Sequence, residues 1–124
     1  MKILFIILIL LVAQYGYARG YDKDEWTKSN TKLEATYFML HIIDWRQTRY
    51  IAKNPDNFYE INPILGEHPS VEEVDRFAAL SMLGHVTISY LLPKKWRKYW
   101  QVGTTVIKLS LIINSEIVGI KIDF

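Results

Sequence analysis

The sequence contains no cysteine. That absence excludes disulfide bonds, thiolate zinc sites, cysteine nucleophiles and a lipid anchor carried on cysteine. There is also little excess charge, because 15 basic and 13 acidic residues leave a formal net charge of +2 in 124 residues. A balance this close to neutral gives no reason to expect a nucleic-acid partner.

Motifs that mark common enzyme classes are missing as well. The chain has no HExxH or paired HxH zinc motif, no calcium-loop spacing, no phosphate-binding or dinucleotide-binding glycine loop and no GxSxG elbow. We therefore expect no cofactor and assign no metal site. Half of the residues are hydrophobic and 14% are aromatic, which is enough for a folded core within one domain.

The N-terminus has the pattern of a secretory signal peptide. Lys2 precedes an apolar run over residues 3–12, and Gly16-Tyr17-Ala18 places small residues at the two positions that a signal peptidase reads. We expect residues 1–18 to be the signal peptide and residues 19–124 to form one helical domain. An uncleaved anchor is the alternative, although the run is short for a membrane span. Either way, the pattern predicts export to the inner membrane or periplasm of a bacterium.

Hydrophobic spacing predicts an all-α domain, with one long helix followed by a helical hairpin. The long helix is expected from about Asp24 to Lys53, with Asp22 and Glu25 as a capping box and Asn54-Pro55 as its end. Its apolar face is expected at six positions with helical spacing: Leu33, Tyr37, Leu40, Ile43, Thr48 and Ile51.

Two further helices are expected to form the hairpin. The second begins at Ser70, which can make a capping box with Glu73, and ends at Leu92. The third is expected from about residue 95 to residue 116. Residues 119–124 alternate apolar and polar side chains, which is a strand-like pattern too short to stand alone.

Charged and aromatic residues indicate how this hairpin sits in a membrane. Residues 94–100 mix four cations with three aromatic side chains, and an acidic stretch over residues 56–75 precedes them. Cations favour the cytoplasmic side of a membrane, and Trp and Tyr favour its interface. We expect residues 77–118 to be a membrane hairpin with its basic turn in the cytoplasm. A soluble periplasmic bundle is the alternative. Membrane lipid is the expected partner, and an envelope protein is a second candidate.

The polar centre of the chain supplies candidate site residues. His41, Asp44 and Thr48 share one helix face at i, i+3 and i+7, and an Asp beside a His can fix the imidazole tautomer. His85 and Asn114 interrupt the apolar stretches of the two later helices. Brought together, these residues could form a proton-handling site, a metal site or contacts that hold the helices together.

The connection between the first two helices adds Glu60, Asn62 and His68 as candidate binding residues. Glu60 and His68, with His41 and Asp44, offer oxygen and nitrogen ligands for a divalent metal. The simpler interpretation of Asn62 and the proline after it is a backbone turn.

Asp44 carries the sharpest structural expectation. It lies within the apolar-periodic long helix, and an unpaired buried carboxylate costs several kcal/mol. We therefore predict that Asp44 is buried and hydrogen-bonded to Thr48, to His85 or to backbone amides of residues 60–66.

The combined pattern resembles a known group of sequences. Asp44-Trp45-x-Gln47-Thr48-Arg49-x-Ile51-Ala52, Glu60-x-Asn62-Pro63-Ile64-Leu65-Gly66-x-His68-Pro69-Ser70 and His85 are similar to small uncharacterised proteins of bacterial genomes and prophages. The resemblance implies a helical, membrane-associated protein and no particular activity. We expect an envelope protein whose polar centre supports structure or partner binding. The alternative is a small membrane-associated hydrolase, either metal-dependent or based on His and Asp, so the sequence leaves open whether the protein is an enzyme.

Overall fold

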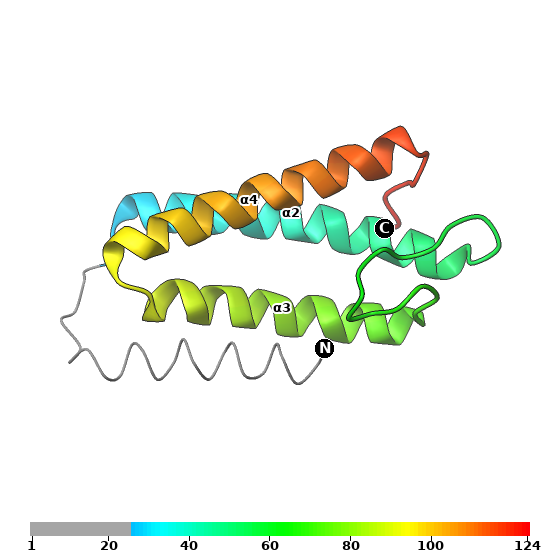
Figure 1. Cartoon of the computed structure of the whole chain (residues 1–124), viewed down its shortest axis with the longest axis horizontal. Helices are drawn as coiled ribbons and strands as arrows, with labels where there is room; N and C mark the ends of the chain where they lie inside the picture. Colours follow the sequence, from blue (N-terminus) through cyan, green and yellow to red (C-terminus); the bar gives the residue numbers. More distant parts are fainter. Residues whose placement is uncertain (1–25) are drawn as a thin grey trace.

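The computed structural model describes residues 26–124, which form three helices joined by one long and one short connection (Figure 1). These are α2 (Lys28–Lys53), α3 (Val71–Leu91) and α4 (Lys94–Ile117). α2 packs against both other helices, and most extensively against α4. The all-α prediction is therefore confirmed for this part of the chain, and the predicted signal peptide lies outside the described residues.

α2 begins later than its hydrophobic spacing predicted. Thr27 has extended backbone angles (φ −92°, ψ 162°) and is the N-cap, so the predicted start at Asp24 is wrong. The Thr27 hydroxyl accepts the N–H of Asn30, and the Asn30 side chain accepts the N–H of Thr27. This capping box satisfies backbone N–H groups at the N-terminus of α2 and marks where the helix begins. The pair predicted for that role, Asp22 and Glu25, lies outside the described residues.

α3 and α4 form the predicted hairpin through a turn of two residues, 92–93. Ser70 and Glu73 make the predicted capping box at the start of α3, with bonds of 3.1 and 2.8 Å. At the other end, the Arg97 guanidinium donates to three main-chain carbonyls, those of Ser89, Tyr90 and Leu92. These donors satisfy acceptors that the last turn of a helix leaves without partners.

The inward faces of the helices follow the alternating three- and four-residue spacing of packed helices. On α2 this spacing runs through Asn30, Glu34, Tyr37, His41, Asp44, Thr48 and Ile51. On α4 it runs through Arg97, Gln101, Thr104, Lys108, Leu111 and Ser115. Most of these side chains are polar, so hydrogen-bonded layers occupy much of the bundle centre. Three positions of the predicted apolar face, Leu33, Leu40 and Ile43, are half-buried beside this polar line.

Five apolar side chains of α4 point away from the bundle. Those of Val102, Val106, Leu109, Ile113 and Ile117 are between 40% and 78% exposed. At 100° per residue they lie on the helix face opposite Gln101, Thr104 and Lys108. We call these five residues the outer stripe. Within residues 26–124, which include the predicted membrane hairpin of residues 77–118, no helix has the length and apolar content needed to cross a membrane.

The C-terminal tail folds back along α2 (Figure 1). Gly119 takes the left-handed conformation (φ 85°) after α4 ends, and Ile120 is buried. The Asp123 N–H then donates to the Arg46 carbonyl, and its carboxylate pairs with Arg49 and Lys53. The strand-like prediction for this tail is wrong, because the described chain has no neighbouring strand for it to pair with.

Candidate functional site

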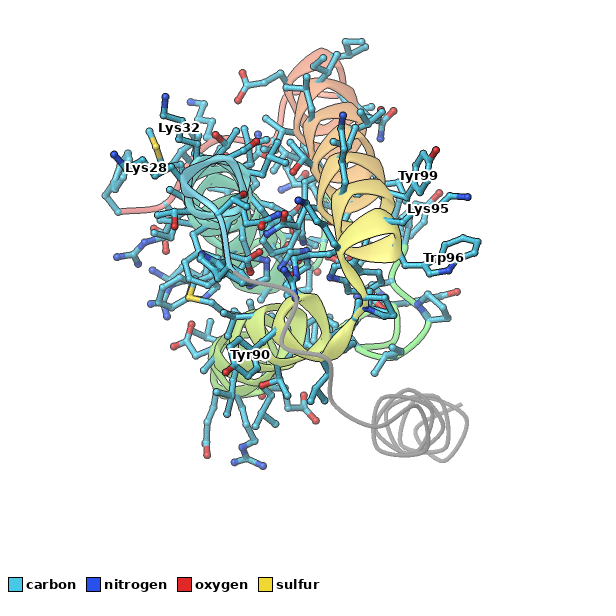
Figure 2. The ribbon with its side chains drawn as sticks, turned by 90° about the vertical axis from the view of Figure 1, so that its left-hand side faces the viewer. Lys28, Lys32, Tyr90, Lys95, Trp96 and Tyr99 are labelled. Atoms are coloured by element: carbon cyan, nitrogen blue, oxygen red, sulfur yellow. The ribbon has the colours of Figure 1, made fainter. Side chains whose placement is uncertain are left out.

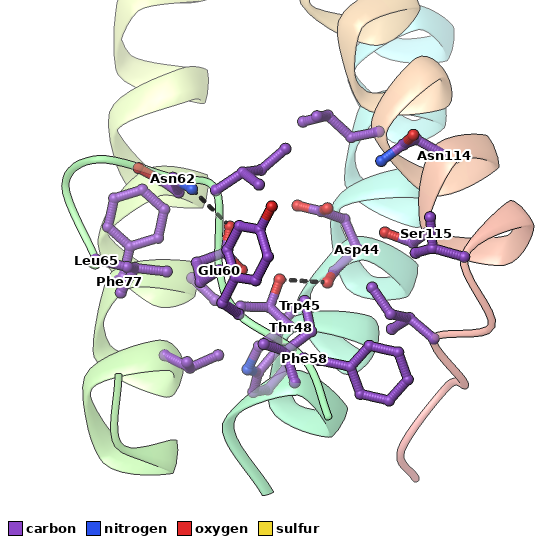
Figure 3. A pocket seen from close by; sticks show the side chains of 18 of the residues that line it. Asp44, Trp45, Thr48, Phe58, Glu60, Asn62, Leu65, Phe77, Asn114 and Ser115 are labelled. Atoms are coloured by element: carbon purple, nitrogen blue, oxygen red, sulfur yellow. Dashed lines mark hydrogen bonds between the residues drawn. The ribbon is translucent and has the colours of Figure 1, made fainter. Parts of the chain in front are cut away.

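A cavity of about 580 Å³ lies between α2, α4, the start of α3 and the connection of residues 54–69 (Figure 3). Much of its wall is apolar or aromatic, including Trp45, Phe58, Leu65, Phe77 and Leu111. Its polar lining includes His41, Asp44, Glu60, Asn62, Lys108 and Asn114. Five of the seven predicted site residues therefore border one cavity; His68 and His85 do not.

Asp44 is hydrogen-bonded, as predicted, but to a partner that the sequence analysis did not consider. Its carboxylate forms an ion pair with Lys108 of α4, and the Asp44 side chain is 19% exposed rather than fully buried. The Thr48 hydroxyl donates to the Asp44 main-chain carbonyl at 3.0 Å, not to the carboxylate. In Figure 3, Asp44 lies between Glu60 on the connection and Asn114 on α4.

Glu60 is a buried carboxylate with few donors. It is 8% exposed, and its Oε1 accepts the N–H of Asn62 at 2.8 Å. Asn62 also shapes the predicted turn, because its Oδ1 accepts the N–H of Ile64 at 2.9 Å. No described side chain donates a hydrogen bond to Glu60. Burial raises the pKa of Glu60; the Asn62 N–H opposes this shift, and the negative charge of Asp44 adds to it.

His41 borders the same cavity with one ring nitrogen unpaired. The side chain is 2% exposed, and Nε2 lies 2.9 Å from the Ala78 carbonyl. A carbonyl can only accept, so Nε2 carries the proton and Nδ1 of the neutral ring is an acceptor. Nδ1 has no hydrogen-bond partner among the described residues. Burial, with a contribution from Lys108, lowers the pKa of His41 and keeps the ring neutral. The expected pair with Asp44 is not formed.

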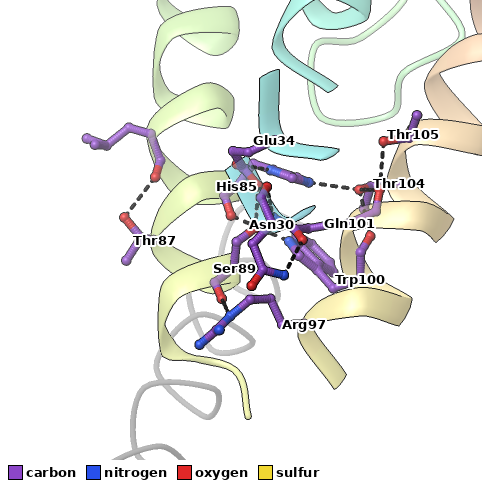
Figure 4. Close-up of polar contacts among 11 residues, drawn as sticks. Asn30, Glu34, His85, Thr87, Ser89, Arg97, Trp100, Gln101, Thr104 and Thr105 are labelled. Atoms are coloured by element: carbon purple, nitrogen blue, oxygen red, sulfur yellow. Dashed lines mark hydrogen bonds and ion pairs between the residues drawn. The ribbon is translucent and has the colours of Figure 1, made fainter. Parts of the chain in front are cut away.

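His85 belongs to a second polar group, which the sequence analysis missed (Figure 4). We call it the Glu34 cluster, and it consists of Asn30, Glu34, His85, Ser89, Gln101 and Thr104. Glu34 is 5% exposed and accepts from His85 Nδ1 at 2.7 Å, Gln101 Nε2 at 2.8 Å and Ser89 Oγ at 2.9 Å. Burial raises the pKa of Glu34, but these donors together lower it below its ordinary value.

The cluster links all three helices. Asn30 Nδ2 donates to Gln101 Oε1, and Gln101 Nε2 donates to the Asn30 carbonyl, both at 3.1 Å. The signal that could have found these residues is the three-and-four spacing itself, continued through polar side chains. The predicted face and the His41, Asp44 and Thr48 pattern covered part of this line, but Asn30 and Glu34 were not recognised as its continuation.

Tyr37 lies between the Glu34 cluster and the cavity. Its ring stacks on His85 with centroids 3.4 Å apart and on His41 with centroids 5.7 Å apart. Trp100 stacks on His85 from α4 at 5.2 Å. Burial raises the pKa of Tyr37 to about 12, so the phenol stays neutral. The two polar regions therefore meet through aromatic rings rather than through hydrogen bonds.

Three members of the cluster lie in the order hydroxyl, imidazole, carboxylate. Thr104 Oγ1 is 2.8 Å from His85 Nε2, and His85 Nδ1 is 2.7 Å from Glu34. Hydrolytic triads have this order, but they also need donors aimed at an oxyanion. Thr104 lies in the middle of α4, where the helix uses the backbone N–H groups, and its hydroxyl is 2.7 Å from the Trp100 carbonyl. The arrangement fits a structural role.

The proposed metal ligands do not come together. His68 is exposed on the connection, away from the cavity lining. Within residues 26–124 no group of three His, Cys, Asp or Glu side chains could hold a metal ion. The four candidates His41, Asp44, Glu60 and His68 therefore do not form a common coordination site.

Comparison with known proteins found no matching family model, no matching curated protein and no matching solved structure. The resemblance to small bacterial and prophage proteins therefore stays a prediction. The fold and its sites define a three-helix bundle with a largely polar interior, an apolar-walled cavity at one end and an outward-facing apolar stripe.

Proposed function

We propose that this chain is a small helical protein of the bacterial envelope that binds the membrane surface through α4. This proposal rests on the orientation of α4, which turns polar side chains toward the bundle and apolar side chains toward the surroundings. Its polar side chains Gln101 and Lys108 face the interior and bond to α2, whereas its outer stripe of apolar side chains is 40–78% exposed. A helix with an apolar face toward the surroundings is typical of proteins that lie in the membrane interface.

The residues at the start of α4 support lipid as the partner. Trp96 and Tyr99 are more than half exposed, and Figure 2 shows them projecting together with Lys95. Lys28 and Lys32 project from α2 at the same end of the bundle, on the opposite side of the view from Trp96 and Tyr99 (Figure 2). Neither helix has an acidic residue in its first turn, and both helix N-termini add partial positive charge there. Cations beside Trp and Tyr suit anionic headgroups.

Export is the second part of this proposal and rests on the signal-like N-terminus. It places the mature chain, starting at Arg19, at the inner membrane or in the periplasm. An envelope protein on the outer stripe is the competing partner. We favour binding over the alternative hydrolase because no described hydroxyl in the cavity is hydrogen-bonded to His41.

Vesicle flotation tests the membrane proposal directly. The chain recovered from bacterial membranes should float with vesicles that contain phosphatidylglycerol and less with purely zwitterionic ones. Ile113→Glu should weaken flotation by about tenfold or more, because a charge in the apolar layer costs at least about 1.4 kcal/mol. Thr36→Glu, an exposed change on α2, is the control. Equal flotation of the two variants would contradict attachment through α4, and N-terminal sequencing of the same sample tests for Arg19.

A further inference from the structure

The cavity has the size and walls of a small-molecule site. Its volume of about 580 Å³ falls within the range of about 300–1,000 Å³ that such sites occupy. Trp45, Phe58 and Phe77 supply aromatic surface from α2, the connection and α3 (Figure 3). The ligand that fits these walls has an apolar or aromatic body.

The charges around the cavity do not balance. Asp44 and Glu60 both border it, and Lys108 is the cation among its lining residues. Lys108 is already paired with Asp44. Glu60 therefore has no ion-pair partner of its own among the described residues: its hydrogen-bond donors are backbone N–H groups, and Lys108 acts on it through charge alone. A positively charged ligand would give Glu60 the ion-pair partner that the described residues do not provide.

The hydrogen-bonding groups at the cavity that lack a partner also favour a ligand that brings donors. His41 Nδ1 is a buried acceptor without a partner, on a ring that is 2% exposed and borders the cavity. Glu60, when ionised, is also an acceptor only. The unfilled groups are thus acceptors, and a ligand that matches them must bring N–H or O–H donors.

We infer that this cavity binds a small organic amine, with its ammonium group against Glu60 and its apolar body against Phe58 and Phe77. An ammonium group supplies both a positive charge and three donors. Its neighbours in the site would be a carboxylate and aromatic rings, both of which attract cations. Burial raises the pKa of Glu60, so the ionised carboxylate is disfavoured in the free site, and a cation bound beside it would stabilise that form. The inference is separate from membrane attachment, which uses the opposite face of α4.

Three probes of one shape test the charge of the ligand. The full chain is titrated calorimetrically with 3-phenylpropylammonium, with the neutral alcohol 3-phenylpropan-1-ol and with the anion 4-phenylbutanoate, in lipid-free buffer at neutral pH. We expect the ammonium to bind about tenfold or more tightly than the alcohol and the anion to bind least. Equal affinities, tighter binding of the anion or no binding at all would overturn the inference.

Glu60→Gln tests the assigned contact, because it keeps the shape of the side chain and removes its charge. It should weaken ammonium binding by about tenfold and leave alcohol binding unchanged. Glu67→Gln is the matched control, since Glu67 is an exposed carboxylate on the same connection and does not border the cavity. An equal effect of both variants would overturn the contact.

A second variant closes the cavity from α4 without touching Glu60. Ser115 borders the cavity and Ser110 is exposed on the same helix, so Ser115→Phe should abolish binding of the ammonium while Ser110→Phe should not. Ammonium binding that survives Ser115→Phe in a folded chain would place the ligand elsewhere and overturn the assignment.

Discussion

Glu34 and Glu60 are both buried carboxylates, 5% and 8% exposed, yet their surroundings push them in opposite directions. Glu34 receives three side-chain donors from α3 and α4, and its pKa is lowered. Glu60 receives backbone N–H groups only, and its pKa is raised. The exposed fractions are nearly equal, so the hydrogen-bond donors and the neighbouring charges decide the direction of each shift: His85 lowers the pKa of Glu34, and Asp44 raises that of Glu60. Glu34 is thus part of the hydrogen-bonded core, whereas Glu60 borders the cavity and keeps acceptor capacity that a ligand could use.

The two carboxylates occupy different ends of the bundle for a topological reason. A turn of two residues holds α3 and α4 together near the Glu34 cluster, and the helices separate beyond it (Figure 1). At the far end the connection of residues 54–69 lies between them, and the cavity is there. The connection makes hydrogen bonds of its own beside the cavity, since Asn62 Oδ1 accepts the N–H of Ile64.

The largest effect on stability is expected from a substitution in the Glu34 cluster. Glu34→Gln removes the charge that His85 faces and misplaces one acceptor for Ser89 and Gln101. Removing one partner from a buried charged network costs about 3–5 kcal/mol, and we expect the free energy of unfolding to fall by about 3 kcal/mol. Urea denaturation measures this, with the exposed Glu67→Gln as control. A loss of under about 0.5 kcal/mol, as for an ordinary surface change, would mean that the cluster does not hold the helices together.

A smaller effect is expected at the ion pair between the two ends. Asp44→Ala leaves Lys108 without its carboxylate in a half-buried position, which should cost about 2 kcal/mol. Asp56→Ala, on the exposed connection, is the control and should change stability by less than about 0.5 kcal/mol. A double-mutant cycle with Lys108→Ala isolates the pair. Additive losses would show that the two side chains act separately.

The sequence specified the helices better than it specified the sites. The end of α2 at Lys53, the Ser70–Glu73 capping box and the two-residue stop before α4 are local features, and each was predicted from residues a few positions apart. The predicted start of α2 was wrong because Asp22 and Glu25 were taken as the capping box, whereas Thr27 and Asn30 form the observed one. Local signals fix such choices only when one cap stands alone.

The polar partners could not be predicted in the same way. His41, Asp44 and Glu60 were identified as candidates, but Asp44 pairs with a lysine 64 residues away, and Glu34 meets a histidine 51 residues away. Such pairs depend on the register of one helix against another, which a single sequence does not state. Lys108 in particular was not among the candidate site residues. Its inward position on the three-and-four spacing of α4 makes it a partner instead.

The smallest effect, and the one of opposite sign, is expected at Glu60. Its pKa is raised above the ordinary value of 4.5, so the folded chain favours the protonated form. Stability from this group is therefore complete below about pH 4.5 and is lost as the pH rises through the raised pKa. Glutamine cannot ionise, so Glu60→Gln should match the parent chain at about pH 4 and become the more stable of the two toward about pH 8.

Glu34 must show the reverse dependence, because its pKa is lowered. The advantage of the parent chain over Glu34→Gln should be full above about pH 4.5 and shrink as the pH falls through the lowered pKa. Thermal unfolding of both variants across this range, with the parent at each pH, compares the two carboxylates within one fold. If the stability difference between parent and variant changed with pH in the same direction at Glu34 and at Glu60, the number of donors would not explain how the two carboxylates differ. Opposite signs, together with weaker amine binding in the more stable Glu60→Gln chain, would show a site that keeps an unfavourable charge for the sake of its ligand.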